Sequence, residues 1–222
     1  MSNDLSHIYQ LMTLATGDEK HSPSAHSTLD ILWVLYDRVL RYDAQHPRSE
    51  ERDRFVLSKG HGPLAYYAIL VDKGFFPASE LSKFLQWDGM LGGHPDRNQV
   101  PGVETSTGSL GHGLAMATGM AVGLRAKQSK RRVFALLGDA ECNEGSVWEA
   151  ALLAGNRQLP HLTCIVVNNH SGSQPMGDIA SKFAAFGWAT TNIDGRDHQQ
   201  IYQALQQHDA QRPTVVVAEI HS

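Results

Sequence analysis

Two uninterrupted apolar runs, at residues 133–137 and 162–167, constrain the fold of this 222-residue chain more than any other feature. Neither run alternates with polar residues, so each predicts a strand that is buried on both faces. The segment between them, about 148–159, has helical spacing, and such a unit implies parallel strands joined by a right-handed crossover. Further strands are predicted at 54–57 and 213–218. The sequence therefore predicts an α/β fold, a doubly wound and mostly parallel sheet with helices on both faces.

Apolar spacing and glycine positions predict the other helices. Apolar residues recur at helical spacing over about 27–41. Gly74 is expected to end the helix before it. The glycine- and alanine-rich segment 110–127 predicts a closely packed, buried helix. We expect one domain over residues 1–222, with an N-terminal helical segment of about 1–50 packed on it.

Composition and charge exclude several classes of function. With 41% hydrophobic and 19% charged residues, the chain resembles an ordinary soluble protein. Its formal net charge of −4 gives no reason to expect a nucleic-acid or membrane partner. The sequence has no signal-peptide pattern and no run of about 18 apolar residues. Cys142 and Cys164 fit no metal or disulfide spacing, so we expect buried free thiols and a cytoplasmic location.

Polar residues follow the two central apolar runs. Asp139 comes after the first run and Gly138, and Asn169 follows the second. In an open parallel sheet, ligands bind beyond the carboxyl ends of the strands, so these two side chains should emerge side by side. A carboxylate and an amide oxygen suit Mg²⁺, which takes about six oxygen ligands, often some from a phosphate. Both residues could instead serve only in turns or caps.

Two glycine-rich segments are candidates for binding a diphosphate. Residues 107–111, Thr-Gly-Ser-Leu-Gly, precede the glycine- and alanine-rich helix, where free backbone N–H groups suit a phosphate. Residues 58–62, Ser-Lys-Gly-His-Gly, place a glycine-flanked histidine after a strand. Taken alone, the first segment is weak evidence, since many helices begin with Thr or Ser followed by Gly, and the second is more often an ordinary loop.

Together, these motifs resemble the thiamine-diphosphate enzymes of the transketolase family, especially the N-terminal subunit of split transketolases. The family's cofactor signature is Gly-Asp-Gly, about thirty residues, then Asn-Asn. Here it reads Gly138-Asp139-Ala140 and Asn168-Asn169. The resemblance implies the thiamine diphosphate-binding fold in its diphosphate-type domain. Further matching segments follow the family's order along nearly the whole chain: 58–62, 93–95, 101–104, 107–111, 138–145, 148–150, 186–188 and 194–195.

The resemblance also implies which residues bind the metal and the cofactor. Asp139 and Asn169 would bind Mg²⁺ (or Ca²⁺ or Mn²⁺) through their side chains, and Ser171 through its backbone carbonyl. The residues implied to hold thiamine diphosphate are His61, Gly108, Ser109, Leu110, Gly138, Asp139, Ala140 and Asn169.

Three further residues match catalytic positions of the family. His21 and His94 match active-site histidines, and histidine can transfer protons at neutral pH. Glu144 matches a glutamate in a carboxylate network across the family's dimer interface. His94 could instead be a turn residue, and the neighbours of His21 differ from the family's.

The function implied by the resemblance is that of a transketolase-like transferase of carbohydrate metabolism. It would move a two-carbon ketol unit from a ketose or ketose phosphate to an acceptor through thiamine diphosphate. In this family a separate pyrimidine-binding domain supplies the glutamate that activates the cofactor. We therefore expect activity only with a C-terminal, pyrimidine-binding partner subunit, in an α2β2 heterotetramer.

Two alternatives remain open. One is thiamine-dependent acyl or ketol transfer to a carrier protein or unusual acceptor in a specialised pathway. The other is a non-catalytic, partner-binding subunit.

Four features depart from the family pattern. Ala140 replaces the third glycine of the signature, which is tolerable if its φ is negative. Residues 20–25 replace a glycine-rich segment, which affects the expected donor specificity. The loop 169–177 is shorter than usual. The chain ends at Ser222, where family members continue with a segment rich in lysine and glycine.

Overall fold

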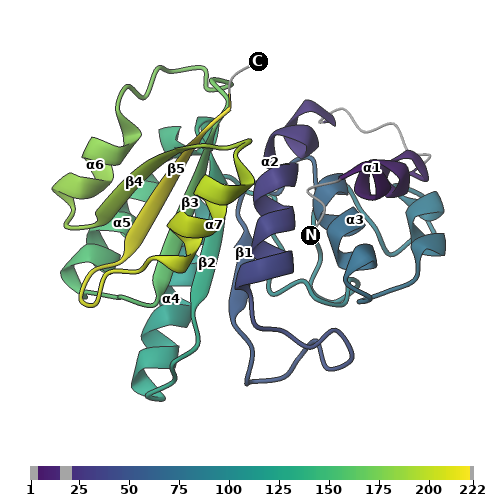
Figure 1. Ribbon diagram of the computed structural model, residues 1–222, viewed down its shortest axis with the longest axis horizontal. Coiled ribbons are helices and arrows are strands. Elements are labelled where there is room, and N and C mark those ends of the chain that lie inside the picture. The colour runs from purple at the N-terminus through teal and green to yellow at the C-terminus, as the bar shows by residue number, and fades with distance from the viewer. Residues whose placement is uncertain (1–4, 16–21, 221–222) are drawn as a thin grey trace.

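A five-stranded sheet forms the centre of the computed structural model, which describes residues 5–15 and 22–220. All neighbouring strands are parallel, in the order β1-β2-β3-β5-β4 (Figure 1). The predicted α/β class with a parallel sheet is confirmed. The strands are β1 (Arg54–Leu57), β2 (Val133–Gly138), β3 (Leu162–Asn168), β4 (Ala189–Asp194) and β5 (Thr214–Glu219).

Helices cover both faces of the sheet, as predicted. One face packs against α4 (His112–Ala126), α5 (Gly145–Asn156) and α6 (Ile179–Ala185), and the other against α2 (Ser22–Val34) and α7 (His198–Gln206). Successive strand residues divide between the two cores. Ala135 and Val166 belong to the first, and Leu136 and Val167 to the second. Both faces are dry, which is why the two runs contain no alternating polar residues.

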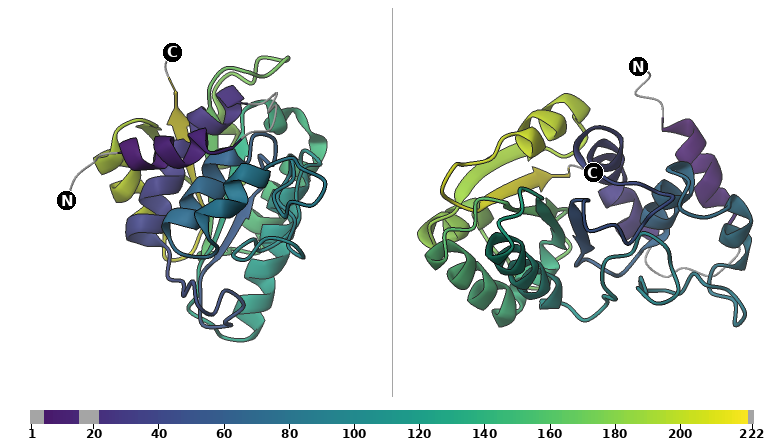
Figure 2. Two further views of the ribbon diagram at one scale, coloured as in Figure 1. Left: turned by 90° about the vertical axis from the view of Figure 1, so that its right-hand side faces the viewer. Right: turned by 90° about the horizontal axis from the view of Figure 1, so that it is seen from below.

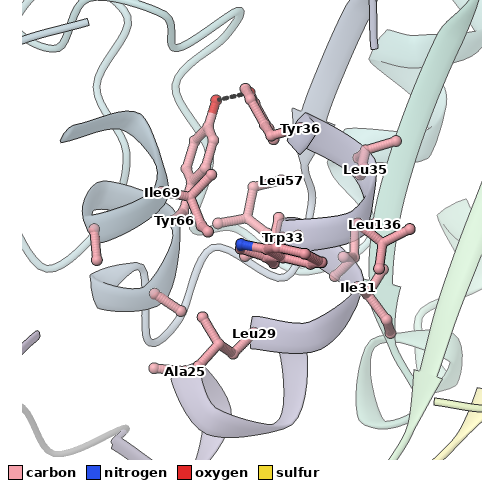
Figure 3. Close-up of a cluster of buried hydrophobic side chains, with 14 of the residues drawn as sticks. Ala25, Leu29, Ile31, Trp33, Leu35, Tyr36, Leu57, Tyr66, Ile69 and Leu136 are labelled. Carbon is pink, nitrogen blue, oxygen red and sulfur yellow. Dashed lines mark hydrogen bonds between the residues drawn. The ribbon is translucent and has the colours of Figure 1, made fainter. Parts of the chain in front are cut away.

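A further helical layer lies beyond α2, away from the sheet (Figures 1 and 2). It contains α1 (Ser6–Thr13), α3 (Leu64–Asp72) and the short 3₁₀ helix η2 (Ala78–Lys83), and α1 packs on α3. The turn η1 (Leu35–Val39) joins this layer through a hydrogen bond of 3.1 Å between the buried hydroxyls of Tyr36 and Tyr66 (Figure 3). The layer therefore packs against the sheet domain through α2 and η1.

The structure shifts some predicted boundaries and adds a strand. The helix predicted at 27–41 begins at Ser22, and its last turn is π-helical. The edge strand β4 was missed, because Ile193 is its only buried residue and no apolar run marks it. The helix α7 begins at His198 because the Asp197 carboxylate accepts hydrogen bonds from the first N–H groups of the helix.

The cysteines and the lengths of the helices can be compared with the sequence-based expectations. Cys142 and Cys164 are buried free thiols. Among these residues no helix combines the length and apolar character needed to cross a bilayer.

Candidate active site

Asp139 lies just beyond the carboxyl end of β2 and holds the loop that follows β3. Its side chain is 5% exposed. One carboxylate oxygen accepts a hydrogen bond of 3.1 Å from the Ser171 hydroxyl, and the other accepts one of 3.0 Å from the Gly172 N–H. A carboxylate that is buried and bonded in this way has a fixed position, as a metal ligand requires.

Asn169 extends from the neighbouring strand at the same edge of the sheet. Gly138 pairs with Val167 in the register of β2 and β3, so Asp139 and Asn169 leave adjacent strand ends. The side-chain oxygen of Asn169 is buried and has no hydrogen-bond partner in the described parts of the chain. A hard cation between the two strand ends would satisfy this oxygen, so the residues present fit the predicted metal.

Ala140, in place of the signature's third glycine, begins the short 3₁₀ helix η3 (Ala140–Asn143). It is not among the non-glycine residues with positive φ. Its methyl group therefore creates no backbone strain, so alanine is tolerated at this position.

The two glycine-rich segments lie directly against each other. A Cβ at Gly60 would lie only 2.8 Å from the backbone nitrogen of Gly108. Gly108 has a φ of 140° and lies so close to His94 that a Cβ would come within 2.7 Å of its ring. The N–H groups of Gly108, Ser109 and Leu110, just before α4, have no acceptor among the described residues. They are available to an anion such as a diphosphate.

His61 and His94 come together at this edge although they belong to different motifs. Their ring centroids are 4.8 Å apart and the rings meet edge to face. The hydroxyl of Tyr67 lies 3.0 Å from the carbonyl oxygens of both Gly92 and His94, where its proton fixes the His94 loop. His94 itself is exposed, as a residue that meets a substrate must be. His21 lies outside the described residues.

Glu144 caps the site on the side of α5. It is exposed and precedes the first residue of that helix. Its side chain packs on Gly111, where an added Cβ would lie 2.7 Å from the Glu144 Cβ. The predicted interface glutamate is thus adjacent to the glycine-rich segment and open to a partner.

Glu141 connects the predicted segments and was not assigned a role from the sequence. It is 1% exposed, and its Oε1 accepts hydrogen bonds from the Ser58 hydroxyl and from the Gly111 N–H, the latter at 2.8 Å. Burial raises the pKa of this carboxyl. One buried side chain therefore holds the loop after β1, the start of α4 and the end of β2 together.

Lys59 is a second functional candidate that sequence reasoning missed. Its ammonium group donates hydrogen bonds to the Ser27 hydroxyl at 2.8 Å and to the Ser24 carbonyl at 3.4 Å. Burial lowers the pKa of Lys59 to about 8, although the charge of Asp139 acts in the opposite direction. Lys59 lies within the segment 58–62 that matches the family, so the sequence did point to it, but the sequence did not predict that its side chain is buried.

Comparison with known proteins identifies the family. Residues 8–220 match the model of the transketolase, thiamine diphosphate binding domain. The chain belongs to this family. It is 47% identical over 213 residues to a protein of Rhodococcoides fascians named "Ferredoxin fas2", with 95% of this chain and 70% of that protein covered.

Two further proteins resemble this transketolase domain. The 6-deoxy-6-sulfo-D-fructose transketolase subunit SqwG of Clostridium sp. (strain MSTE9) is 37% identical, with 84% of this chain and 70% of that protein covered. The crystal structure of transketolase from Campylobacter jejuni superposes with a TM-score of 0.81 at 27% identity, covering 98% of this chain but 38% of that one. The family's cofactor, thiamine diphosphate, is accordingly the cofactor of this domain.

Proposed function

We propose that this chain is the thiamine diphosphate- and Mg²⁺-binding subunit of a two-component transketolase-type enzyme. The enzyme transfers a two-carbon ketol unit from a ketose to an acceptor. The observation that carries the proposal is the meeting of Asp139, Asn169, His61 and the segment 107–111 at one edge of the sheet. The Clostridium relative is itself named a transketolase subunit for a ketose, which supports a split enzyme.

The metal would be held by the side chains of Asp139 and Asn169 and by the backbone carbonyl of Ser171. Mg²⁺ fits this set of hard oxygen ligands best, and Ca²⁺ or Mn²⁺ could replace it. The diphosphate would face the free N–H groups of residues 108–110, together with His61, Gly138 and Ala140. Thiamine diphosphate, when bound, supplies the nucleophilic carbon and the electron sink for cleavage beside a ketose carbonyl.

His94 is the proposed proton-transfer residue of this chain, with His21 as a second. His94 is exposed at the site, while its loop is fixed by Tyr67. Removal of a proton from a sugar hydroxyl and its later return need a group with a pKa near neutrality, which histidine has. His61, packed edge-on against His94, orients that ring.

The partner subunit would complete the site from the side of Glu144. An exposed carboxylate beside the cofactor segment is placed to join a network with carboxylates of another subunit. The partner would supply the glutamate that activates the cofactor, in an α2β2 heterotetramer.

The test is to purify this chain with its pyrimidine-binding partner, add thiamine diphosphate and Mg²⁺, and measure ketose cleavage. The complex should be active, and each subunit alone should not. Asp139→Ala should abolish activity and cofactor binding while leaving the complex assembled. Full activity of the isolated chain, or of the Asp139→Ala complex, would contradict the proposal.

A second candidate function has support from one relative's name. The Rhodococcoides protein is named a ferredoxin, and this chain covers 70% of it. This favours an oxidative form of the reaction, in which the two-carbon unit would give two electrons, one at a time, to a one-electron carrier and water would release the unit as a carboxylic acid. Ketose-dependent reduction of ferricyanide by the complex, faster than transfer to an aldose acceptor, would support this candidate over ketol transfer.

A further inference from the structure

The buried ammonium group of Lys59 lies beside the candidate cofactor site and has no role in the function proposed above. Lys59 is 8% exposed. Its Nζ donates hydrogen bonds to two neutral oxygens, the Ser27 hydroxyl at 2.8 Å and the Ser24 carbonyl at 3.4 Å. Within residues 5–15 and 22–220, it forms no ion pair with a carboxylate. The charge of this group is therefore buried without direct neutralisation by the described residues.

A buried cation of this kind is unfavourable for folding. Transfer of an ammonium group out of water costs free energy unless negative charge and hydrogen bonds compensate for the lost hydration. Burial lowers the pKa of Lys59 to about 8, and the charges of Asp139 and Glu141 offset only part of that effect. The ammonium has three N–H groups but two acceptors in the described part of the chain. Both features indicate that an anionic ligand accounts for this lysine.

The Lys59 side chain adjoins both halves of the candidate site. Its stem packs on Gly138, where an added Cβ would lie 3.1 Å from the Lys59 Cε, and Asp139 is the next residue of the chain. On the other side, a Cβ at the neighbouring Gly60 would lie 2.8 Å from the backbone nitrogen of Gly108. Lys59 is therefore close to the proposed metal ligand and to the segment proposed to hold the diphosphate.

A fixed positive charge at this place acts in opposite directions on the two groups that the site is proposed to bind. It repels a divalent cation at Asp139 and attracts phosphate oxygens at residues 108–110. Salt screens the charge only weakly because the side chain is buried. The Asp139 carboxylate alone would attract any divalent cation, and Lys59 reduces that attraction.

We propose that Lys59 selects the diphosphate over a divalent cation bound alone. The proposal rests on the function proposed above. The ammonium contributes attraction to the diphosphate, and it makes the site unfavourable for a metal ion that arrives without the negative charge of the cofactor. The discrimination comes from a repulsive charge, which keeps metal ions from occupying the site before the cofactor arrives.

The experiment measures binding rather than turnover, on the complete two-subunit complex freed of cofactor and metal. It is done at about pH 7, where a group with a pKa of about 8 is mostly protonated. Electron paramagnetic resonance of free Mn²⁺ gives the affinity for a metal alone. Calorimetry in the presence of EDTA gives the affinity for thiamine diphosphate alone.

Three variants separate the charge of Lys59 from its other contacts. Lys59→Met removes the charge and keeps an apolar stem against Gly138. Ser27→Ala removes the 2.8 Å hydrogen bond but keeps the charge. Lys127→Met makes the same substitution at a side chain 67% exposed and is the control.

Lys59→Met should bind Mn²⁺ at least about fivefold more tightly and thiamine diphosphate at least about fivefold more weakly than wild type. Ser27→Ala and Lys127→Met should stay within about twofold of wild type in both measurements. Loss of a merely structural contact would weaken both ligands, so any result for Lys59→Met other than opposite changes would overturn the proposal. If Lys59→Met does not assemble with its partner, Lys59→Gln, which keeps a hydrogen-bond donor without the charge, decides between the same outcomes.

Failure of this proposal differs from failure of the proposed function. If the wild-type complex binds both ligands and cleaves a ketose, but Lys59→Met changes neither affinity, only the assignment of Lys59 is wrong. If the wild-type complex binds neither Mn²⁺ nor thiamine diphosphate, both proposals are wrong.

Discussion

The Asp139 carboxylate accepts a hydrogen bond from the Ser171 hydroxyl, 3.1 Å away, across the loops that follow two neighbouring strands. A metal at Asp139 would compete with that hydroxyl, while the backbone carbonyl of Ser171 would remain available to it. Ser171→Ala should therefore retain the rise in Tm that cofactor and Mg²⁺ produce, and Asp139→Ala should lose it. Thermal shift of the complex measures both. A loss in Ser171→Ala as complete as in Asp139→Ala would show that the hydroxyl is a ligand.

Glu141 should be important for stability as well as for the cofactor site. Glu141→Ala leaves the Ser58 hydroxyl and the Gly111 N–H without their buried acceptor, at ~1–3 kcal/mol for each group. We expect a loss of ~2–6 kcal/mol in the free energy of unfolding, and a smaller loss in Glu141→Gln, which keeps one acceptor oxygen. Denaturant titration checks this. Glu51→Ala, at a side chain 81% exposed, should cost under ~1 kcal/mol.

Gly108 and Gly119 should respond to alanine in opposite ways. A Cβ at Gly108 would meet His94 at 2.7 Å and occupy a backbone conformation that favours glycine, whereas nothing lies within 4 Å of a Cβ at Gly119 in α4. Gly108→Ala should weaken thiamine diphosphate binding by at least tenfold, measured by calorimetry on the complex. Gly119→Ala should stabilise the isolated chain by ~0.5–1 kcal/mol. Equal cofactor affinity in wild type and Gly108→Ala would contradict the proposal that the N–H groups of residues 108–110 bind the diphosphate.

Lys59 should make stability depend on pH. The pKa of Lys59 is about 8 in the folded chain and 10.5 in the unfolded chain. Between these two pH values, the unfolded chain therefore holds a proton that the folded chain does not. This contribution to the free energy of unfolding is full above pH 10.5 and is lost as the pH falls to 8. From pH 7.5 to 9.5, wild type without cofactor should gain ~2 kcal/mol relative to Lys59→Met.

Burial raises the pKa values of the Cys142 and Cys164 thiols, which makes the folded chain less stable as the pH rises, opposite to the effect of Lys59. This effect is the same in wild type and in Lys59→Met, so the comparison of the two cancels it. Lys127→Met, at a side chain 67% exposed, is the control and should follow the wild-type profile. Parallel pH profiles for Lys59→Met and wild type would show that Lys59 is not protonated differently on folding.

The sequence predicted the features that arise locally. The apolar runs at 133–137 and 162–167 define two buried strands wherever they lie, and the polar residues that follow them are placed by the rule for parallel sheets. The glycine-rich segments were also recognisable, because backbones that approach as closely as Gly60 and Gly108 do leave room for no other residue. Helices on both faces followed from the same apolar pattern.

The sequence did not predict features that depend on distant partners. Ser58 and Glu141 share a buried hydrogen bond across 83 positions, and no spacing rule links them. The edge strand β4 packs only one side chain into the core, so its residues carry no apolar pattern. The full exposure of Trp87 is a further example, because nothing in its sequence neighbours predicts it. These features become visible only when the chain is folded.

All five strands point the same way, so every loop that follows a strand reaches a single edge, while the strands other than the edge strand β4 are buried between two layers of helices. The loops at that edge carry the candidate site, most of the apolar core lies behind them, and buried Glu141 belongs to both. Replacement of a loop that follows a strand, such as the one after β3, should change the site without redesign of the scaffold. Engineering for specificity and engineering for robustness can therefore use different residues of this chain, except where Glu141 links the two.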